Sequence, residues 1–194
     1  AVRYYALSEM PYANDGSITY ESVITRYNND LANNLGNLVN RTVTMTKKYF
    51  DGIIPAPTCP EALDDELKAM AEKTYADVCA QMDTYHIADA VETLFALYSR
   101  ANKYIDETAP WTLAKSEETK GRLQTVIYNL LETIRIGAVL LASLMPATAE
   151  SIFSQIGSDK TDFDSALTFV GLVSGKTVGE SSALFAIIDE AKLM

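Results

Sequence analysis

The chain has 194 residues, of which 48% are apolar, and its 16 basic and 26 acidic side chains give a net charge of −10. A chain of this length can form one domain with a sizeable hydrophobic core. The two cysteines, Cys59 and Cys79, and the single histidine exclude a disulfide scaffold, a four-thiolate zinc site and a histidine-rich metal centre. So few cysteines favour a reducing, cytoplasmic setting.

The negative charge is unevenly distributed along the chain. Residues 51–100 carry three basic and ten acidic side chains, whereas residues 1–50 carry five basic and four acidic ones. Because phosphate groups attract lysine and arginine, the first 50 residues remain suited to a nucleic acid despite the acidic total. The longest apolar stretch, Ile136 to Met145, is shorter than the roughly 18 residues of a membrane span, so no membrane partner is expected.

The first predicted element is a connector over residues 1–18, which we expect to follow a missing upstream part because the chain starts at Ala1 without an initiator methionine. Turn-forming residues fill its second half, and Ser17 or Thr19 can cap the helix that follows. That helix is predicted from Thr19 to about Tyr49, since apolar residues recur on one face at about 100° per residue. They are Ile24, Tyr27, Leu31, Leu35 and Leu38.

The rest of the chain also reads as helices. Prolines and a glycine predict a surface loop over residues 51–60, and the apolar periodicity weakens beyond residue 157. Further helices are predicted from Pro60 to about Met82, from Tyr85 or His86 to about Thr108, from Glu117 to Leu144, and over a short stretch from Pro146. The sequence therefore predicts an all-α fold, an antiparallel bundle of about five helices over residues 19–157, with residues 158–194 as an irregular C-terminal tail packed on it.

No catalytic constellation is found in the sequence. The stretch GLVSGKT, residues 171–177, looks like a phosphate loop but has three residues between its glycines where a P-loop has four. Asp83 and His86 have the spacing of half a di-iron motif, but there is no second histidine to complete it. A lone histidine also leaves no serine or cysteine with an evident base. We therefore predict no catalytic residue and no metal ligand.

Asparagine is concentrated in the first long helix, with six in thirteen residues from Asn28 to Asn40. Each costs up to ~0.7 kcal/mol relative to alanine in a helix interior, so another interaction should compensate. Asn33, Asn37 and Arg41 are spaced to form one row opposite the apolar face, with Asn34 beside it. Amides and a guanidinium can read the edges of unstacked bases. Alternatively, these amides form a solvated face or pin a neighbouring helix.

The only tryptophan, Trp111, follows Pro110, which is expected to end the third helix. An indole at such a corner can be exposed and serve as a stacking platform for a base. Alternatively, Trp111 packs into the end of the bundle.

These residues carry a resemblance to the methionyl-tRNA synthetase family of class I aminoacyl-tRNA synthetases. DLANNLGNLVNRTVTM, from Asp30, and NKYIDETAPWTLAK, from Asn102, resemble its anticodon-binding helical bundle. RLQTVIYNLLETIRIGAVLLASLMPATAESI resembles its later helices, and AVRYYALSEMPYANDGS resembles the connector from its catalytic half. The match covers about residues 1–157.

The resemblance implies binding of the anticodon loop of a tRNA, with recognition of the CAU anticodon of methionine tRNA. Asn37 and Arg41 match positions that contact anticodon bases. Trp111 matches the indole that stacks on the first of them, with Pro110 fixing its corner. Asn34 stands where family members commonly have aspartate.

The family's adenylation signatures lie on a domain that would precede Ala1, and neither occurs here. The resemblance therefore implies that this fragment is non-catalytic and a monomer without cofactors, and that ATP and methionine bind only the parent protein. A zinc insert, common in the family, would also lie upstream. Two alternatives remain, an anticodon-binding bundle of a cysteinyl or leucyl synthetase and a helical protein-interaction domain.

Overall fold

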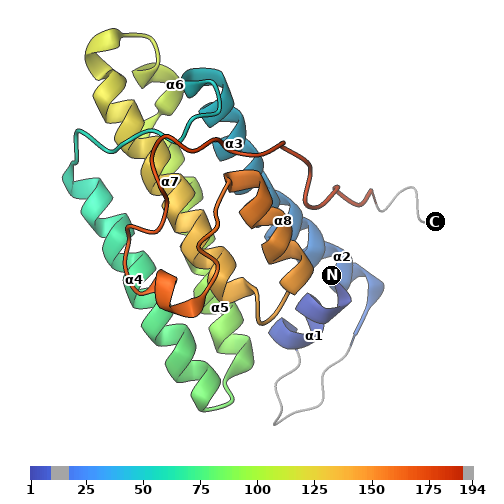
Figure 1. The fold of residues 1–194 in the computed structure, drawn as a ribbon. Helices are drawn as coiled ribbons and strands as arrows, with labels where there is room; N and C mark the ends of the chain where they lie inside the picture. Colours follow the sequence, from blue (N-terminus) through green and yellow to red (C-terminus); the bar gives the residue numbers. More distant parts are fainter. Residues whose placement is uncertain (10–17, 190–194) are drawn as a thin grey trace.

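A computed structural model describes residues 1–9 and 18–189 as an all-α bundle (Figure 1). Across these two ranges there is no β-strand beyond an isolated bridge between Ile53 and Thr177. The α-helices are α1 (Val2–Glu9), α2 (Tyr20–Arg26), α3 (Asn37–Phe50), α4 (Ala62–Asp83), α5 (Ile87–Thr108), α6 (Pro110–Leu113), α7 (Lys120–Leu141) and α8 (Pro146–Ile156). This confirms the predicted fold class, while the predicted turn before residue 18 and its alternative cap Ser17 lie outside the described residues.

The first long helix is only partly α-helical. Thr19 caps it as predicted, since its hydroxyl accepts from the backbone N–H of Ser22. Between α2 and α3, however, the ten residues of η1 (Tyr27–Gly36) form a π-helix with i→i+5 hydrogen bonds. The prediction of one regular α-helix was therefore wrong in its middle third. Four of the six asparagines lie in this segment, where their weak α-helical preference offers little resistance to another hydrogen-bond pattern.

The loop before α4 is more buried than the sequence suggested. Ile54 is fully buried, and its backbone pairs with the C-terminal tail, donating to Lys176 O and accepting from Gly175 N, both at 2.8 Å. The prediction of a surface loop therefore holds for most of residues 51–60, which are exposed, but not for the part around Ile54, which the tail covers. Helix α4 starts at Ala62 instead of Pro60, and Glu61 caps it in a reciprocal capping box with Asp64.

Helix α7 is the centre of the bundle. It contacts α3, α4, α5 and α8, and almost all its side chains after Gln124 are buried (Figure 1). A short 3₁₀ turn, η2 (Glu117–Thr119), precedes it, and α7 ends at Leu141, three residues before the predicted end. The part of the tail up to residue 189 contains one further 3₁₀ turn, η3 (Phe163–Ala166), which lies against α7.

Two ionic groups that the sequence analysis did not predict are buried around α7. Near its start, Arg122 donates to both oxygens of Asp64, at 2.6 and 2.8 Å, and Tyr104 donates to the same carboxylate. The Asp64 side chain is fully buried, although its neighbours Asp65 and Glu66 are exposed. The carboxylate therefore joins α4, α5 and α7.

The second group lies in the middle of α7. Glu132 and Arg135, both fully buried, form a two-point ion pair at 2.7 and 3.0 Å. Glu132 also accepts from the backbone N–H groups of Gly171 and Leu172. The glycine of the phosphate-loop-like stretch therefore binds a carboxylate of this chain, and the interaction anchors the tail.

Acid unfolding should report on Asp64. Burial raises the pKa of Asp64, but hydrogen bonds from Arg122 and Tyr104 outweigh burial and hold this pKa below its ordinary value of 3.8. The stabilisation is therefore complete above about pH 4 and is lost as the pH falls through the lowered pKa. The unfolding free energy of the original chain should fall below pH 4, and Asp64→Asn should make this fall smaller. Urea titrations at several pH values measure the unfolding free energy of both proteins. An unchanged pH dependence would contradict this assignment.

Candidate nucleic-acid interface

The solvent face of the first long helix carries two free amides and a weakly paired guanidinium. Asn33 and Asn37 are exposed, and within the described residues neither makes a side-chain hydrogen bond. Arg41 lies one turn beyond Asn37 in α3 and donates to Asp106 at 3.2 Å, in a pair whose side chains are 31% and 67% exposed. An exposed ion pair contributes little, so Arg41 can exchange this partner for another acceptor.

Other asparagine side chains of the same helix form hydrogen bonds with neighbouring parts of the chain. Asn34 donates to Ser99 Oγ at 2.9 Å and accepts from Asn102 at the same distance. Asn28 exchanges two hydrogen bonds with the backbone of Ile188, and Asn40 accepts from Ser181. Asn34 was predicted to face RNA, but the structure gives it the alternative role of pinning a neighbouring helix. Its position beside the row was predicted, whereas its contact with α5 could not be read from spacing.

The corner between α5 and α6 presents the indole. Ala109 adopts a left-handed conformation, with φ of 43°, and closes α5 through a hydrogen bond from its N–H to Ile105 O. Pro110 then starts α6, so Trp111 lies in a short helix and not in the predicted loop. The Trp111 side chain is 45% exposed, as a stacking platform requires. Pro110 is buried, so it can fix the corner but is not placed to contact RNA.

Arg41 and Trp111 belong to one end of the bundle. Arg41 pairs with Asp106 in the last turn of α5, and Trp111 follows five positions later. Between the end of α3 and the end of α6 lies a cavity of about 230 Å³, with Lys48 and Lys120 among its lining residues. Lys120 pairs with Glu117, which also lines this cavity. Arg41 and the exposed indole thus lie toward this end of the bundle, with the exposed amide of Asn37 one turn before Arg41, and such groups also occur at sites for single-stranded nucleic acid.

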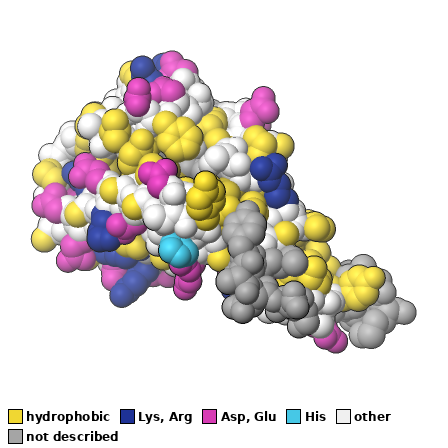
Figure 2. Space-filling model, turned by 90° about the horizontal axis from the view of Figure 1, so that it is seen from below, with side chains coloured by type: hydrophobic (Ala, Val, Ile, Leu, Met, Phe, Trp, Pro, Cys, Tyr) yellow, Lys and Arg dark blue, Asp and Glu magenta, His cyan; other side chains and the backbone are white. Residues whose placement is uncertain are grey.

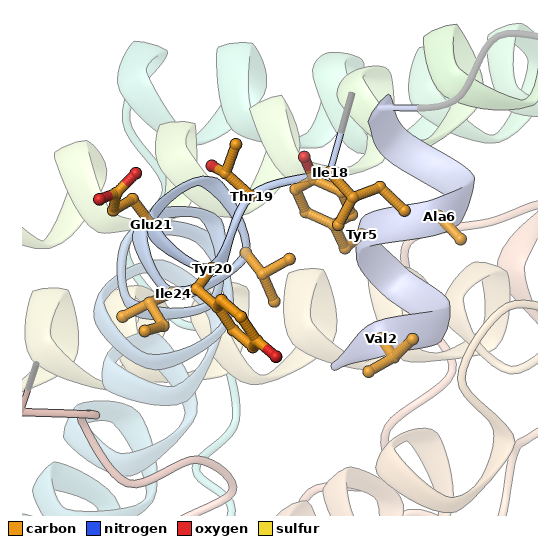
Figure 3. A pocket seen from close by; sticks show the side chains of 9 residues that line it. Val2, Tyr5, Ala6, Ile18, Thr19, Tyr20, Glu21 and Ile24 are labelled. Atoms are coloured by element: carbon orange, nitrogen blue, oxygen red, sulfur yellow. The ribbon is translucent and has the colours of Figure 1, made fainter. Parts of the chain in front are cut away.

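The other end of the bundle has a different character. The face that carries the single histidine shows mixed acidic, basic and apolar side chains, and no continuous basic surface appears on it (Figure 2). A groove of about 630 Å³ lies between α1 and α2, where the side chains of Val2, Tyr5 and Tyr20 surround a largely apolar space (Figure 3). Among the described residues that line it, the one charged side chain is Glu21. Such a groove does not suit a phosphate backbone.

Among residues 1–9 and 18–189, no three His, Cys, Asp or Glu side chains are grouped so that they could hold a metal ion. None of the helices in this part of the chain is both long and apolar enough to cross a membrane.

Two family profiles match the chain. One, described as the anticodon binding domain of methionyl tRNA ligase, matches residues 54–194, and the other, tRNA synthetases class I (M), matches residues 1–43. These matches favour the methionyl family over the cysteinyl and leucyl alternatives.

Curated relatives and solved structures agree with the profiles. The methionine–tRNA ligases of Clostridium perfringens and Clostridium tetani are each 48% identical, over 100% and 99% of this chain and 30% of their own length. The chain thus spans about a third of these relatives. Apo methionyl-tRNA synthetase of Mycobacterium tuberculosis superposes with a TM-score of 0.91 at 34% identity, covering 97% of this chain and 38% of that one. The chain therefore belongs to the methionyl-tRNA synthetase family and carries its anticodon-binding domain.

Proposed function

We propose that this domain binds the anticodon loop of methionine tRNA and reads its CAU anticodon. The observation that supports the proposal is the Arg41–Asp106 pair, which links α3, one turn after Asn37, to the last turn of α5 just before the exposed indole of Trp111. An anticodon loop presents unstacked bases, which suit amide and guanidinium donors and an open ring face.

The proposal assigns a role to each side chain. Trp111 stacks on the first anticodon base, while Asn37 and Arg41 hydrogen-bond to base edges. Asn33 extends the polar row, and Pro110 holds the corner from inside the fold. In the parent protein, this binding would direct methionine tRNA to an upstream site that uses ATP and methionine, in the cytoplasm. The domain itself would act as a monomer without a cofactor.

Variants at Trp111 and Arg41 test the proposal through different quantities. Trp111→Ala should lose about 1–3 kcal/mol of binding to a CAU hairpin, the usual contribution of one base stack, and Trp111→Phe should lose less. Arg41→Gln should reduce discrimination between CAU and altered anticodons by about 1–3 kcal/mol, because it removes a directed, charged donor. The measurement is fluorescence anisotropy of labelled hairpins, which does not depend on the indole.

A matched control uses another exposed aromatic residue. Tyr20 is 90% exposed and lies beside the apolar groove, so Tyr20→Ala should leave hairpin affinity unchanged. If the original chain binds CAU and scrambled hairpins equally, the domain does not read the anticodon. In that case, the remaining alternative is a helical module that binds protein.

A further inference from the structure

The π-helix η1 ends at a point where helix α5 holds it through side-chain amides. Asn102, on α5, donates to both the backbone carbonyl of Asn34, at 3.1 Å, and its side-chain oxygen, at 2.9 Å. The Asn34 amide in turn donates to Ser99 Oγ at 2.9 Å and to Phe95 O at 3.3 Å. Four hydrogen bonds therefore join one residue of η1 to a single neighbouring helix.

This contact lies at the change from π-helix to α-helix. The backbone N–H of Asn37 is directed to both Ala32 O, five positions earlier, and Asn34 O, three positions earlier. The carbonyl that Asn102 binds is thus the one at which the hydrogen-bond pattern changes. Because a π-helix has more residues per turn than an α-helix, the place where it ends determines the direction of every later side chain.

The π-helical pattern needs support from outside the helix. Runs of this kind are rare and usually extend for a single turn, whereas η1 has ten residues. Within η1 itself, an added Cβ at Gly36 would lie only 3.0 Å from Leu31 O, so this turn of the π-helix is tight. The four hydrogen bonds at Asn34 supply support from outside the helix. Contacts with α5 are therefore part of what selects the π-helix over a continuous α-helix.

The same helix α5 leads directly to the exposed indole. Asn102 and Asp106 lie one turn apart on it, and Trp111 follows after the corner at Ala109. Asn102 therefore connects the end of η1, just before α3 begins, to the helix that leads to the corner before Trp111, at a point before the exposed Arg41–Asp106 pair.

We propose that Asn34 and Asn102 are positioning residues, which fix the direction in which α3 presents Asn37 and Arg41 relative to Trp111. In this role they set the discrimination between anticodons without contacting RNA. The inference rests on the proposed function and names the residues that regulate the specificity of the same site.

The test compares the discrimination ratio, the dissociation constant for an altered hairpin divided by that for a CAU hairpin. Asn102→Ala should lower this ratio about tenfold, the effect of displacing one directed base contact. Hydrogen exchange should also become faster at the backbone amides of residues 35–38, because the end of the π-helix loses its support. The discrimination ratio and the exchange rates are both measured well below the melting temperature. Under these conditions, a purely structural role of Asn102 would leave the ratio unchanged.

Asn28→Ala is the matched control. Asn28, like Asn34, is an asparagine of η1, but its two hydrogen bonds join the helix to the backbone of Ile188 in the tail instead of to α5. This variant should lower stability and leave the discrimination ratio unchanged. If Asn102→Ala does not fold, Ser99→Ala, which removes one acceptor of the Asn34 amide, should change the ratio in the same direction by a smaller factor.

The outcomes separate the inference from the function on which it rests. A folded Asn102→Ala variant with an unchanged ratio and unchanged exchange would overturn the inference, as would an equal loss of discrimination in Asn28→Ala. If the original chain does not distinguish the hairpins, the proposed function fails. In that case, hydrogen exchange still tests the positioning role. Faster exchange in Asn102→Ala supports this role, and unchanged exchange refutes it.

Discussion

Glu132→Ala should destabilise the folded chain by about 3–5 kcal/mol, because it leaves the buried Arg135 guanidinium without its charge partner. The variant also removes the acceptor for the backbone N–H groups of Gly171 and Leu172. Unpaired buried donors add a desolvation cost of about 1–3 kcal/mol each where water cannot reach them. Urea unfolding followed by circular dichroism measures the total.

Glu180→Ala is the control for Glu132→Ala. Glu180 pairs with Lys47 at 3.0 Å, but its side chain is 99% exposed, so its removal should cost less than about 1 kcal/mol. Hydrogen exchange adds a second readout, since only Glu132→Ala should increase exchange at Gly171 and Leu172. Similar losses of stability in both variants would mean that burial does not determine the strength of the Glu132–Arg135 pair.

Leu35→Ala should cost about 2–5 kcal/mol of stability, whereas Asn37→Ala should leave the melting temperature unchanged or slightly raised. Leu35 is fully buried, so its truncation removes packed methyl groups and leaves a cavity. Asn37 is exposed, and alanine is the better helix former at its position. Thermal unfolding of the two variants measures the contrast between a core residue and a residue of the proposed RNA-binding face.

Two outcomes would contradict the expected contrast between Leu35→Ala and Asn37→Ala. If Asn37→Ala unfolds the bundle, the Asn37 amide is structural and its assignment to base reading fails. If Leu35→Ala retains full stability, the core around η1 relaxes to fill the space. Hairpin binding by Asn37→Ala completes the comparison, because only this variant should lose affinity while it remains stable.

Helices whose apolar periodicity is regular could be predicted from the sequence. Helix α5 begins and ends close to its predicted positions, and α8 begins at the predicted Pro146, since apolar faces and terminal signals agree. The π-helix could not be predicted, because it depends on hydrogen bonds to α5 that involve residues far apart in sequence. Periodicity reports the buried face of a helix but not its hydrogen-bond pattern.

Buried charges were the second gap in the prediction. Glu132 and Arg135 stand within an apolar run and are three positions apart, and this spacing is a signal of an internal ion pair that the sequence analysis did not use. The partner of Asp64 gives no comparable signal, because Arg122 is 58 positions away. Charge counts along the chain therefore do not reveal that one of the ten acidic side chains of residues 51–100 is buried.

Residues of the candidate site could be predicted from the sequence where only their exposure to solvent had to be known. Trp111 follows a proline that breaks the helix, and Asn37 and Arg41 are one helical turn apart on the polar face. The distinction between Asn34 and Asn37 was not predictable, because the two are equally polar and differ only in what lies opposite them. Only the packing of α5 separates a structural amide from a free one.

The contact between the loop before α4 and the tail has a consequence for the order of events during translation. Pro55 O accepts from Ser174 Oγ, 119 positions later, whereas α4 and α5 are neighbours in sequence and can pair as soon as both have left the ribosome. Until residues 171–176 are synthesised, Ile54 and the Glu132–Arg135 pair lack part of their cover. Nascent chains that stall in this interval would expose an apolar strip and a half-satisfied ion pair, which are features that chaperones and proteases recognise.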